Sequence, residues 1–260
     1  MTNIQAIILA IVEGITEFLP VSSTGHMIIA SSIMGIKPTE YVKMFTVAIQ
    51  FGAILSVVVL YYKRFFQSID FYIKLLVAFI PAAIFGFLLN DLIDSLLENV
   101  LSVAVALVLG GIVLIFADNW FKDTKKTHID LPIALKIGLF QIIAMFPGVS
   151  RSGATIIGGL TQGLSKQAAA EFSFFLAVPT MFAATCYKML KYHKQVGFST
   201  ENTTELLVGN LVAFLVAFLA IRSFVGFVSK NGFKVFGYYR IFVGLTIIVL
   251  YFLKIPLQLL

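Results

Sequence analysis

Residues 13–26 read EGITEFLPVSSTGH, and residues 141–154 read QIIAMFPGVSRSGA. The second stretch aligns with the first at an offset of 128 residues, without a gap. Identical pairs at this offset include Ile15 and Ile143, Phe18 and Phe146, Val21 and Val149, Ser22 and Ser150, and Gly25 and Gly153. The copies differ in charge, because Glu13 aligns with Gln141 and Ser23 with Arg151. The chain therefore holds two related polar turns, one acidic and one basic, that look like facing half-sites.

The composition of the chain indicates an integral membrane protein. Hydrophobic residues make up 59% of the 260 residues and charged residues only 12%, which is about half the charged share of a globular protein. A soluble core could not bury this much apolar surface. The net charge of +6 is attributed to cytoplasmic loops and anionic lipid headgroups, so membrane lipids are expected partners and nucleic acid is not. The single cysteine, Cys186, excludes an internal disulfide.

Six apolar runs are long enough to cross a bilayer, which takes about 20 residues. They lie at 43–62, 71–90, 100–119, 167–190, 206–228 and 234–254. Two further segments, 3–35 and 131–163, each contain two short apolar arms around a turn with proline, glycine and serine. Irregular backbone at membrane depth must be surrounded by protein or water, so each segment is predicted to be a re-entrant hairpin. A kinked full span is the alternative.

Each half of the chain would then contain one re-entrant hairpin followed by three transmembrane helices. Because three is odd, the second half begins on the opposite face of the membrane, and the halves form an inverted-topology repeat. The predicted fold class is therefore an all-α integral membrane protein with a single membrane domain, 1–260, whose halves are 1–125 and 126–260. The two hairpin tips should approach each other from opposite sides.

Lysine and arginine residues in short loops set the expected orientation. One face would carry Lys63, Arg64, Lys122, Lys125, Lys126, Lys166, Lys230 and Lys234. The other would carry Lys37, Lys43, Lys188, Lys191, Lys194 and Lys254. We expect the first face to be cytoplasmic, which places both termini and the first hairpin outside. Arg222, Arg240 and Lys188 lie near span ends and are expected to extend to the membrane surface.

The first turn carries most of the candidate chemistry. Glu13 and Glu17 share one helix face, and two carboxylates at membrane depth need a cation, a partner or water. They could bind a divalent cation, Mg²⁺ or Ca²⁺, since both prefer oxygen ligands; a solvated pair at the membrane surface is the alternative. Ser23 is the candidate nucleophile because a base lies near its hydroxyl. His26 is the candidate for proton transfer.

The start of the following helix is a candidate phosphate site. Ser22 and Thr24 could simply cap this helix. With Gly25, they could instead present hydroxyls and free N–H groups to an anion.

The second turn is predicted to clamp an anion. The planar guanidinium of Arg151 matches phosphate oxygens. Ser150 and Ser152 add hydroxyl donors, and Gly148 and Gly153 permit close approach of the backbone. A salt bridge from Arg151 to Glu17 or Glu13 is the alternative. Three polar residues within spans are weaker candidates, which could line the cavity or bond neighbouring helices: Gln50, Glu171 and Asn210.

Acids, a hydroxyl and an anion clamp within a membrane protein suggest phosphoryl transfer on a lipid phosphate. A transporter is the rival prediction, because inverted repeats with broken helices are typical of transporters.

At both turns the chain resembles the bacitracin-resistance type of undecaprenyl-diphosphate phosphatase. Residues 13–26 are similar to that family's glutamate-rich motif, and residues 147–155 are similar to its second motif; residues 48–54 and 171–179 also resemble it. The resemblance covers essentially the whole chain. It implies hydrolysis of undecaprenyl diphosphate to the monophosphate carrier for peptidoglycan synthesis, divalent-metal dependence, and a site open to the outer face of the bacterial inner membrane. A polyprenyl diphosphate lipid is thus the expected substrate, and a homodimer is a conceivable assembly.

Overall fold

The computed structural model describes residues 1–66, 68–89, 92, 96, 99–121, 124–255 and 257, without the side chain of Glu201. Over these residues the chain is helical and has no β-strand. Lys122, one of the residues used to predict orientation, lies outside the described residues.

Six spans in the described part of the chain are long and apolar enough to cross a membrane. They are α3 and α4 together (Glu40–Leu60), α6 (Ile69–Leu88), α8 (Val100–Trp120), α11 (Lys166–Gln195), α12 (Thr200–Asn231) and α13 (Lys234–Phe252). A single turn of helix, α5 (Tyr62–Phe65), follows α4. These helices match the six predicted spans, although α11 and α12 extend past the apolar runs. The start of α12 is set by a cap and not by hydropathy, since the Ser199 side chain accepts the N–H of Asn202.

The first span is interrupted at Ile49, between α3 (Glu40–Ala48) and α4 (Gln50–Leu60). The backbone N–H of Gly52 donates to the side-chain oxygen of Asn210 at 2.6 Å. A side chain inserted into the hydrogen-bond ladder is a known cause of helix breaks. Asn210 on α12 therefore bonds a neighbouring helix, which is one of the two roles predicted for it. Gln50 is the first residue of α4.

The two remaining segments contain the predicted short arms. The first consists of α1 (Asn3–Thr16) and α2 (Ser23–Ile33), and the second of α9 (Leu131–Ile143) and α10 (Arg151–Thr161). The residue before the second arm has a positive φ in both copies, 67° at Ser22 and 75° at Ser150. Positive φ is uncommon outside glycine. The two turns therefore share an unusual backbone shape at the aligned serines.

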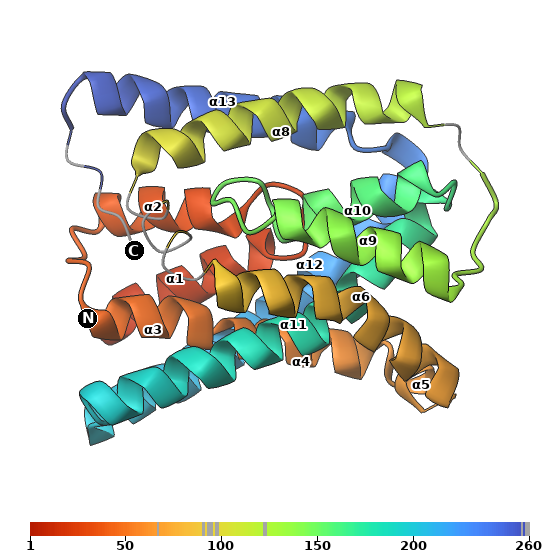
Figure 1. Cartoon of the computed structure of the whole chain (residues 1–260). Coiled ribbons are helices and arrows are strands. Elements are labelled where there is room, and N and C mark those ends of the chain that lie inside the picture. The colour runs from red at the N-terminus through yellow and green to blue at the C-terminus, as the bar shows by residue number, and fades with distance from the viewer. Residues whose placement is uncertain are drawn as a thin grey trace.

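The first arm of each segment packs against a helix from the other half of the chain. A Cβ added to Gly14 of α1 would lie 2.8 Å from the Cβ of Val216 on α12, and one added to Gly138 of α9 would lie 2.3 Å from the carbonyl oxygen of Ala78 on α6. These backbones therefore touch. Helices α8 and α13 run side by side in a separate layer over the short helices (Figure 1). The two turns consequently meet inside the molecule.

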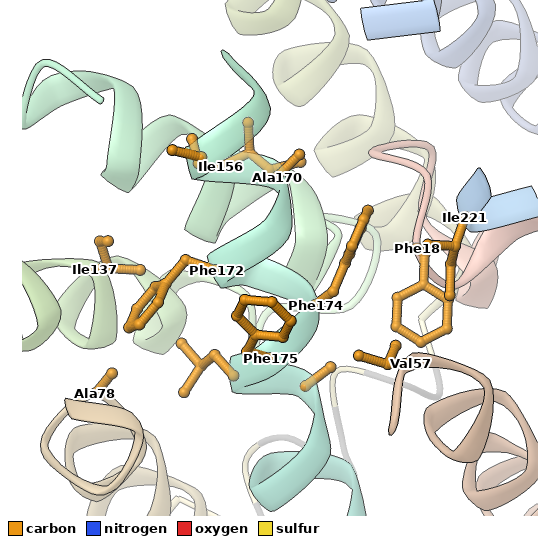
Figure 2. Close-up of a cluster of buried hydrophobic side chains, with 14 of the residues drawn as sticks. Phe18, Val57, Ala78, Ile137, Ile156, Ala170, Phe172, Phe174, Phe175 and Ile221 are labelled. Carbon is orange, nitrogen blue, oxygen red and sulfur yellow. The ribbon is translucent and has the colours of Figure 1, made fainter. Parts of the chain in front are cut away.

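Phe18 of the first turn packs into an aromatic core with phenylalanines of α11 (Figure 2). Phe18 is fully buried, and its ring meets that of Phe174 on α11 edge to face, with centroids 5.4 Å apart. Phe172 and Phe175 on α11 extend the same cluster. Edge-to-face contacts hold an aromatic side chain in a defined orientation. The backbone beside Phe18, including its neighbour Glu17, is therefore held against α11.

The expectation that Arg240 extends to the membrane surface is wrong. Its side chain is 1% exposed and lies between α13, α8 and both turns. Backbone carbonyl oxygens bond its guanidinium there, which is how a buried cation avoids the cost of lost hydration. By contrast, Arg222 on α12 is exposed.

Candidate active site

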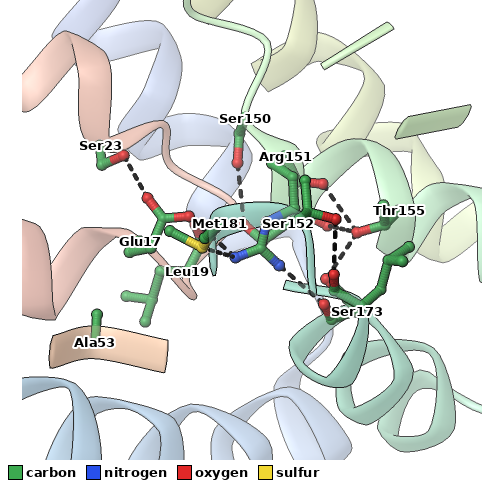
Figure 3. Close-up of polar contacts among 12 residues, drawn as sticks. Glu17, Leu19, Ser23, Ala53, Ser150, Arg151, Ser152, Thr155, Ser173 and Met181 are labelled. Carbon is green, nitrogen blue, oxygen red and sulfur yellow. Dashed lines mark hydrogen bonds and ion pairs between the residues drawn. The ribbon is translucent and has the colours of Figure 1, made fainter. Parts of the chain in front are cut away.

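Glu17 joins the two turns through its two carboxylate oxygens (Figure 3). Ser23 Oγ donates to Glu17 Oε2 at 2.7 Å, and Arg151 Nη2 donates to Glu17 Oε1 at 3.0 Å. The salt bridge considered for Arg151 is therefore formed with Glu17, at side-chain exposures of 12% and 7%. A hydroxyl bonded to a buried carboxylate has the geometry of a nucleophile beside its base.

Arg151 is held on several sides, and one of its nitrogen atoms, Nε, has no hydrogen-bond partner. Its Nη1 donates to the carbonyl oxygen of Ser173 at 2.9 Å, and its guanidinium carbon lies 5.6 Å from the centre of the Phe18 ring. Its Nε is buried and bonds no protein atom. Buried donors are rarely left unpaired. The free Nε is therefore suited to an anionic ligand.

Glu13 lies beside Glu17, one turn earlier on the same face of α1. Its side chain is 1% exposed, its electrostatic neighbours include Glu17, Arg151 and Gln50, and its Oε1 has no hydrogen-bond partner. Two adjacent carboxylates in an apolar setting need a compensating charge. Within the described residues, no group of three or more His, Cys, Asp or Glu side chains could hold a metal. A cation here would thus bind two carboxylates and complete its shell with other oxygens.

The serines of the second turn mainly shape it. Ser150 Oγ accepts the backbone N–H of Gly153 at 3.2 Å and lies 3.0 Å from Ser152 Oγ. Ser152 Oγ also donates to the carbonyl oxygen of Leu19 at 2.8 Å, which ties the second turn to the first. In the first turn, Ser22 stands before α2 but its side chain makes no capping bond. Its hydroxyl is therefore not used as the ordinary cap considered above.

His26 does not lie with the carboxylates. Its Nδ1 is 2.8 Å from the carbonyl oxygen of Ser22, and its Nε2 is 2.8 Å from the hydroxyl of Tyr239 on α13. The two rings are stacked, with centroids 5.4 Å apart. Tyr239 was not singled out in the sequence, since nothing in an apolar run of α13 marks it as a partner of a residue in the first turn.

One cavity of about 210 Å³ gathers most candidate residues. Its walls include Glu17, Ser22, Ser23, Thr24, Gly148, Ser150 and Arg151. Glu13, Gly25, His26, Ser152 and Gly153 are not among its lining residues, and Glu13 instead lines a neighbouring cavity. Gln50, Thr180 and Met181 also line it, and of these the sequence predicts only Gln50 as a residue that could line the cavity. Polar residues at the start of α4 and within α11 thus complete the site.

Two of the larger cavities that share walls with this one differ in character. A polar cavity of about 320 Å³ shares Ser23, Thr24 and Gln50 and is also lined by three lysines, Lys43, Lys188 and Lys191. A mostly apolar cavity of about 690 Å³ shares Gln50, Arg151 and Thr180 and lies between α6, α9 and α11. Gln50 borders all three cavities. The site therefore lies between a polar space and an apolar one, which suits an amphiphilic ligand.

Comparison with known proteins places the chain in a family. The family model described as "Bacitracin resistance protein BacA" matches residues 6–246. The chain belongs to the BacA family. It is 61% identical to an undecaprenyl-diphosphatase of Flavobacterium psychrophilum over 100% of both chains. It is 56% identical to one of Bdellovibrio bacteriovorus over 99% of both, and 48% identical to one of Aquifex aeolicus over 95% of this chain and 97% of that one.

Membership of the BacA family and six candidate spans together indicate a multi-pass protein of the bacterial inner membrane. In this BacA-family chain the two sequence motifs contribute most of the cavity wall around Glu17 and Arg151.

Proposed function

We propose that the chain is an undecaprenyl-diphosphate phosphatase. It hydrolyses undecaprenyl diphosphate to undecaprenyl phosphate and inorganic phosphate, which recycles the lipid carrier for peptidoglycan synthesis and underlies bacitracin resistance. The observation that carries this proposal is the carboxylate of Glu17, bonded to a hydroxyl from one turn and a guanidinium from the other. Full-length similarity to proteins named undecaprenyl-diphosphatase supports it.

Ser23 and Glu17 supply the bond-making step. Ser23 Oγ attacks the terminal phosphorus while its proton passes to Glu17, and the bond to the bridging oxygen breaks to release undecaprenyl phosphate. Water then cleaves the phosphoserine and releases inorganic phosphate. Alternatively, Ser23 positions a water molecule that attacks the terminal phosphorus directly. Rapid acid quenching with labelled substrate distinguishes these two mechanisms, since only attack by Ser23 leaves phosphate on its side chain.

The second turn and the start of α2 bind the diphosphate. Arg151 offers its unpaired Nε, and guanidinium groups stabilise charge on phosphoryl oxygens. The N–H groups at the starts of α2 and α10 add positive potential. Ser22, Thr24, Gly148 and Ser150 line the same cavity as Arg151 and add hydroxyl groups and close backbone approach. Gly25, Ser152 and Gly153 do not line it and instead support the shape of the two turns. Arg151→Ala should abolish most phosphate release, and near-normal release in detergent would refute this assignment.

A divalent cation, Mg²⁺ or Ca²⁺, is the proposed cofactor. Glu13 and Glu17 would hold it, and the unpaired Oε1 of Glu13 supports this fit. When bound, the cation would neutralise charge on the diphosphate oxygens. Loss of activity with EDTA, restored by Mg²⁺ or Ca²⁺, is the expected result.

The contacts of His26 favour a supporting role in the first turn over direct proton transfer. Its two ring nitrogens bond the carbonyl oxygen of Ser22 and the hydroxyl of Tyr239, and neither bonds a carboxylate. We therefore propose that His26 supports the first turn and reaches the reaction through Ser22. His26→Gln, which can keep one of these bonds, should retain more activity than His26→Ala; equal and complete losses would favour direct proton transfer.

The inverted repeat, with two re-entrant hairpins and a site open to the outer face, is also proposed. The matched positive φ at Ser22 and Ser150 supports it. So does the crossed packing, because α1 and α12 at the first hairpin correspond to α9 and α6 at the second. The test is cysteine labelling in intact cells with Cys186→Ala. A cysteine at Lys191 should react from outside and one at Lys63 should not.

A transporter of undecaprenyl phosphate is the alternative, and the names of the relatives give it no support. The deciding experiment is phosphate release from undecaprenyl diphosphate by purified protein, with and without EDTA, beside lipid movement in liposomes. Movement without hydrolysis would favour the transporter. Light scattering in detergent would test whether the chain forms a homodimer.

A further inference from the structure

The guanidinium of Arg240 uses all its donors on backbone carbonyls. An arginine side chain has five N–H donors. Those of Arg240 reach five carbonyl oxygens at 2.9–3.3 Å, which belong to Pro20, Ala106, Leu107, Gly148 and Val149. No ion pair to Arg240 is formed within the described residues. The cation is thus satisfied entirely by the main chain of three separate segments.

Two of these carbonyls are equivalent in the repeat. Pro20 and Gly148 align at the 128-residue offset, and each lies two residues before a serine with positive φ. Arg240 bonds Pro20 at 3.1 Å and Gly148 at 2.9 Å. A single side chain therefore grips the two turns at the same place in each.

Apolar packing alone does not explain such a residue. A buried arginine is costly in a membrane, and an apolar side chain would join α13 to α8 at lower cost. The carbonyls that Arg240 bonds lie close to the site along the chain, since Pro20 is three residues from Glu17 and Val149 is two from Arg151. A shift of either turn would separate the hydroxyl, carboxylate and guanidinium that meet at Glu17.

We propose that Arg240 is a positioning residue for the hydrolysis, which sets the distance between the two turns by bonding their carbonyls. Lysine cannot replace it, because a single ammonium lacks the planar fork that reaches several acceptors at once. The kinetic part of this inference rests on the proposed function.

The first test substitutes Arg240 and a matched control. Arg240→Lys should lower kcat by about 100-fold, the usual effect of a displacement near 1 Å, and should raise KM. Arg222→Lys changes an exposed arginine of α12 and should leave both unchanged. A loss of folded enzyme lowers apparent kcat without changing KM, so an Arg240→Lys variant with unchanged KM would overturn the proposal.

A second variant displaces the guanidinium and leaves Arg240 in place. A Cβ on Gly110 of α8 would lie 2.1 Å from Arg240 Nη2, whereas one on Gly226 of α12 meets nothing within 4 Å. Gly110→Ala should therefore lower kcat and raise KM, and Gly226→Ala should change neither. In an Arg240→Met background Gly110→Ala should have no further effect, since both act on one contact. Additive losses would overturn the proposal.

Hydrogen exchange tests the grip without relying on activity. Residues 17–22 and 144–150 should exchange faster in Arg240→Lys and Gly110→Ala than in wild type, Arg222→Lys or Gly226→Ala. Unchanged exchange in both turns would overturn the proposal even if the wild type hydrolyses the lipid. If Arg240→Lys and Gly110→Ala exchange faster but the wild type releases no phosphate, the proposed function is refuted, and the positioning of the two turns by Arg240 still stands.

Discussion

The two turns have a similar backbone conformation at the aligned serines but present different side chains. Both end at a serine with positive φ, and both follow a buried polar residue, Glu13 in the first and Gln141 in the second. Phe18 is fully buried, whereas the aligned Phe146 is 54% exposed and lines the cavity. The same fold element is therefore anchored in the core on one side and open on the other.

The charged side chains of the site are also divided between the two turns. The first turn contributes carboxylates and the hydroxyl of Ser23, and the second contributes the guanidinium of Arg151. Ser150 caps its own helix whereas Ser22 does not. The hydroxyl of Ser150 is thus engaged within its own turn, whereas that of Ser22 makes no capping bond, although both serines line the cavity. A common backbone shape can hold two different chemical tasks.

The largest expected difference in activity is between variants of Glu17 and of Met145, the residue that aligns with it in the second turn. Glu17→Gln removes the charge that binds Ser23 and Arg151, so kcat should fall by about 10²–10⁴-fold, the range of a lost general base. Met145→Leu keeps volume in an apolar wall and should stay near wild type. Phosphate release at saturating lipid measures both. Comparable losses in the two variants would mean that the turns contribute alike.

Arg151→Lys tests the basic side of the comparison. Lysine keeps the charge but cannot bond Glu17 and the Ser173 carbonyl together. We expect kcat to fall by about 10²-fold, as for removal of one donor to a developing negative charge. Arg64→Lys, at an exposed arginine after α4, is the control. Activity within a few-fold of wild type would show that charge alone suffices at Arg151.

Glu13 and Gln141 should differ in their effect on metal dependence. Glu13→Gln removes one of the two proposed carboxylate ligands, so the Mg²⁺ concentration for half-maximal activity should rise by about 10-fold or more. Gln141→Met should leave that concentration unchanged. Titration of EDTA-treated enzyme with Mg²⁺ gives the comparison. An unchanged requirement in Glu13→Gln would place the metal elsewhere.

The smallest expected effect concerns the two serines before the second arms. Ser150→Ala removes a cap and should lower the free energy of unfolding by about 1 kcal/mol. Ser22→Ala removes no capping bond and should leave stability unchanged. Chemical denaturation in a fixed detergent measures both. Equal losses would indicate that the first serine stabilises its helix by another route.

The sequence predicts the parts of the site that depend on local pattern. The offset repeat predicts that the turns match, and the opposite charges allow a salt bridge from Arg151 to Glu17 or Glu13, of which the structure forms the first. Six spans and two broken segments follow from hydropathy and from proline and glycine in the turns. These features are encoded within single stretches of chain.

Contacts between distant residues could not be predicted in the same way. Arg240 lies near the end of an apolar run, and hydropathy alone does not distinguish an arginine that reaches water from one that bonds five carbonyls. The pairing of His26 with Tyr239 joins residues that are 213 positions apart. The break at Ile49 depends on Asn210 from another helix. Each of these depends on which helices become neighbours.

The crossed packing of α1 on α12 and of α9 on α6 resembles an exchange of arms between two copies of one unit. A shorter chain with one copy could complete these contacts only with a second molecule, as domain-swapped dimers do. Identical subunits, however, would carry the same residues in both turns. Joining two copies in one polypeptide removes that constraint, so one arm could acquire the carboxylates and the other the guanidinium. Because both turns lie in one polypeptide, their sequences can differ, and the site can hold carboxylates on one side and a guanidinium on the other.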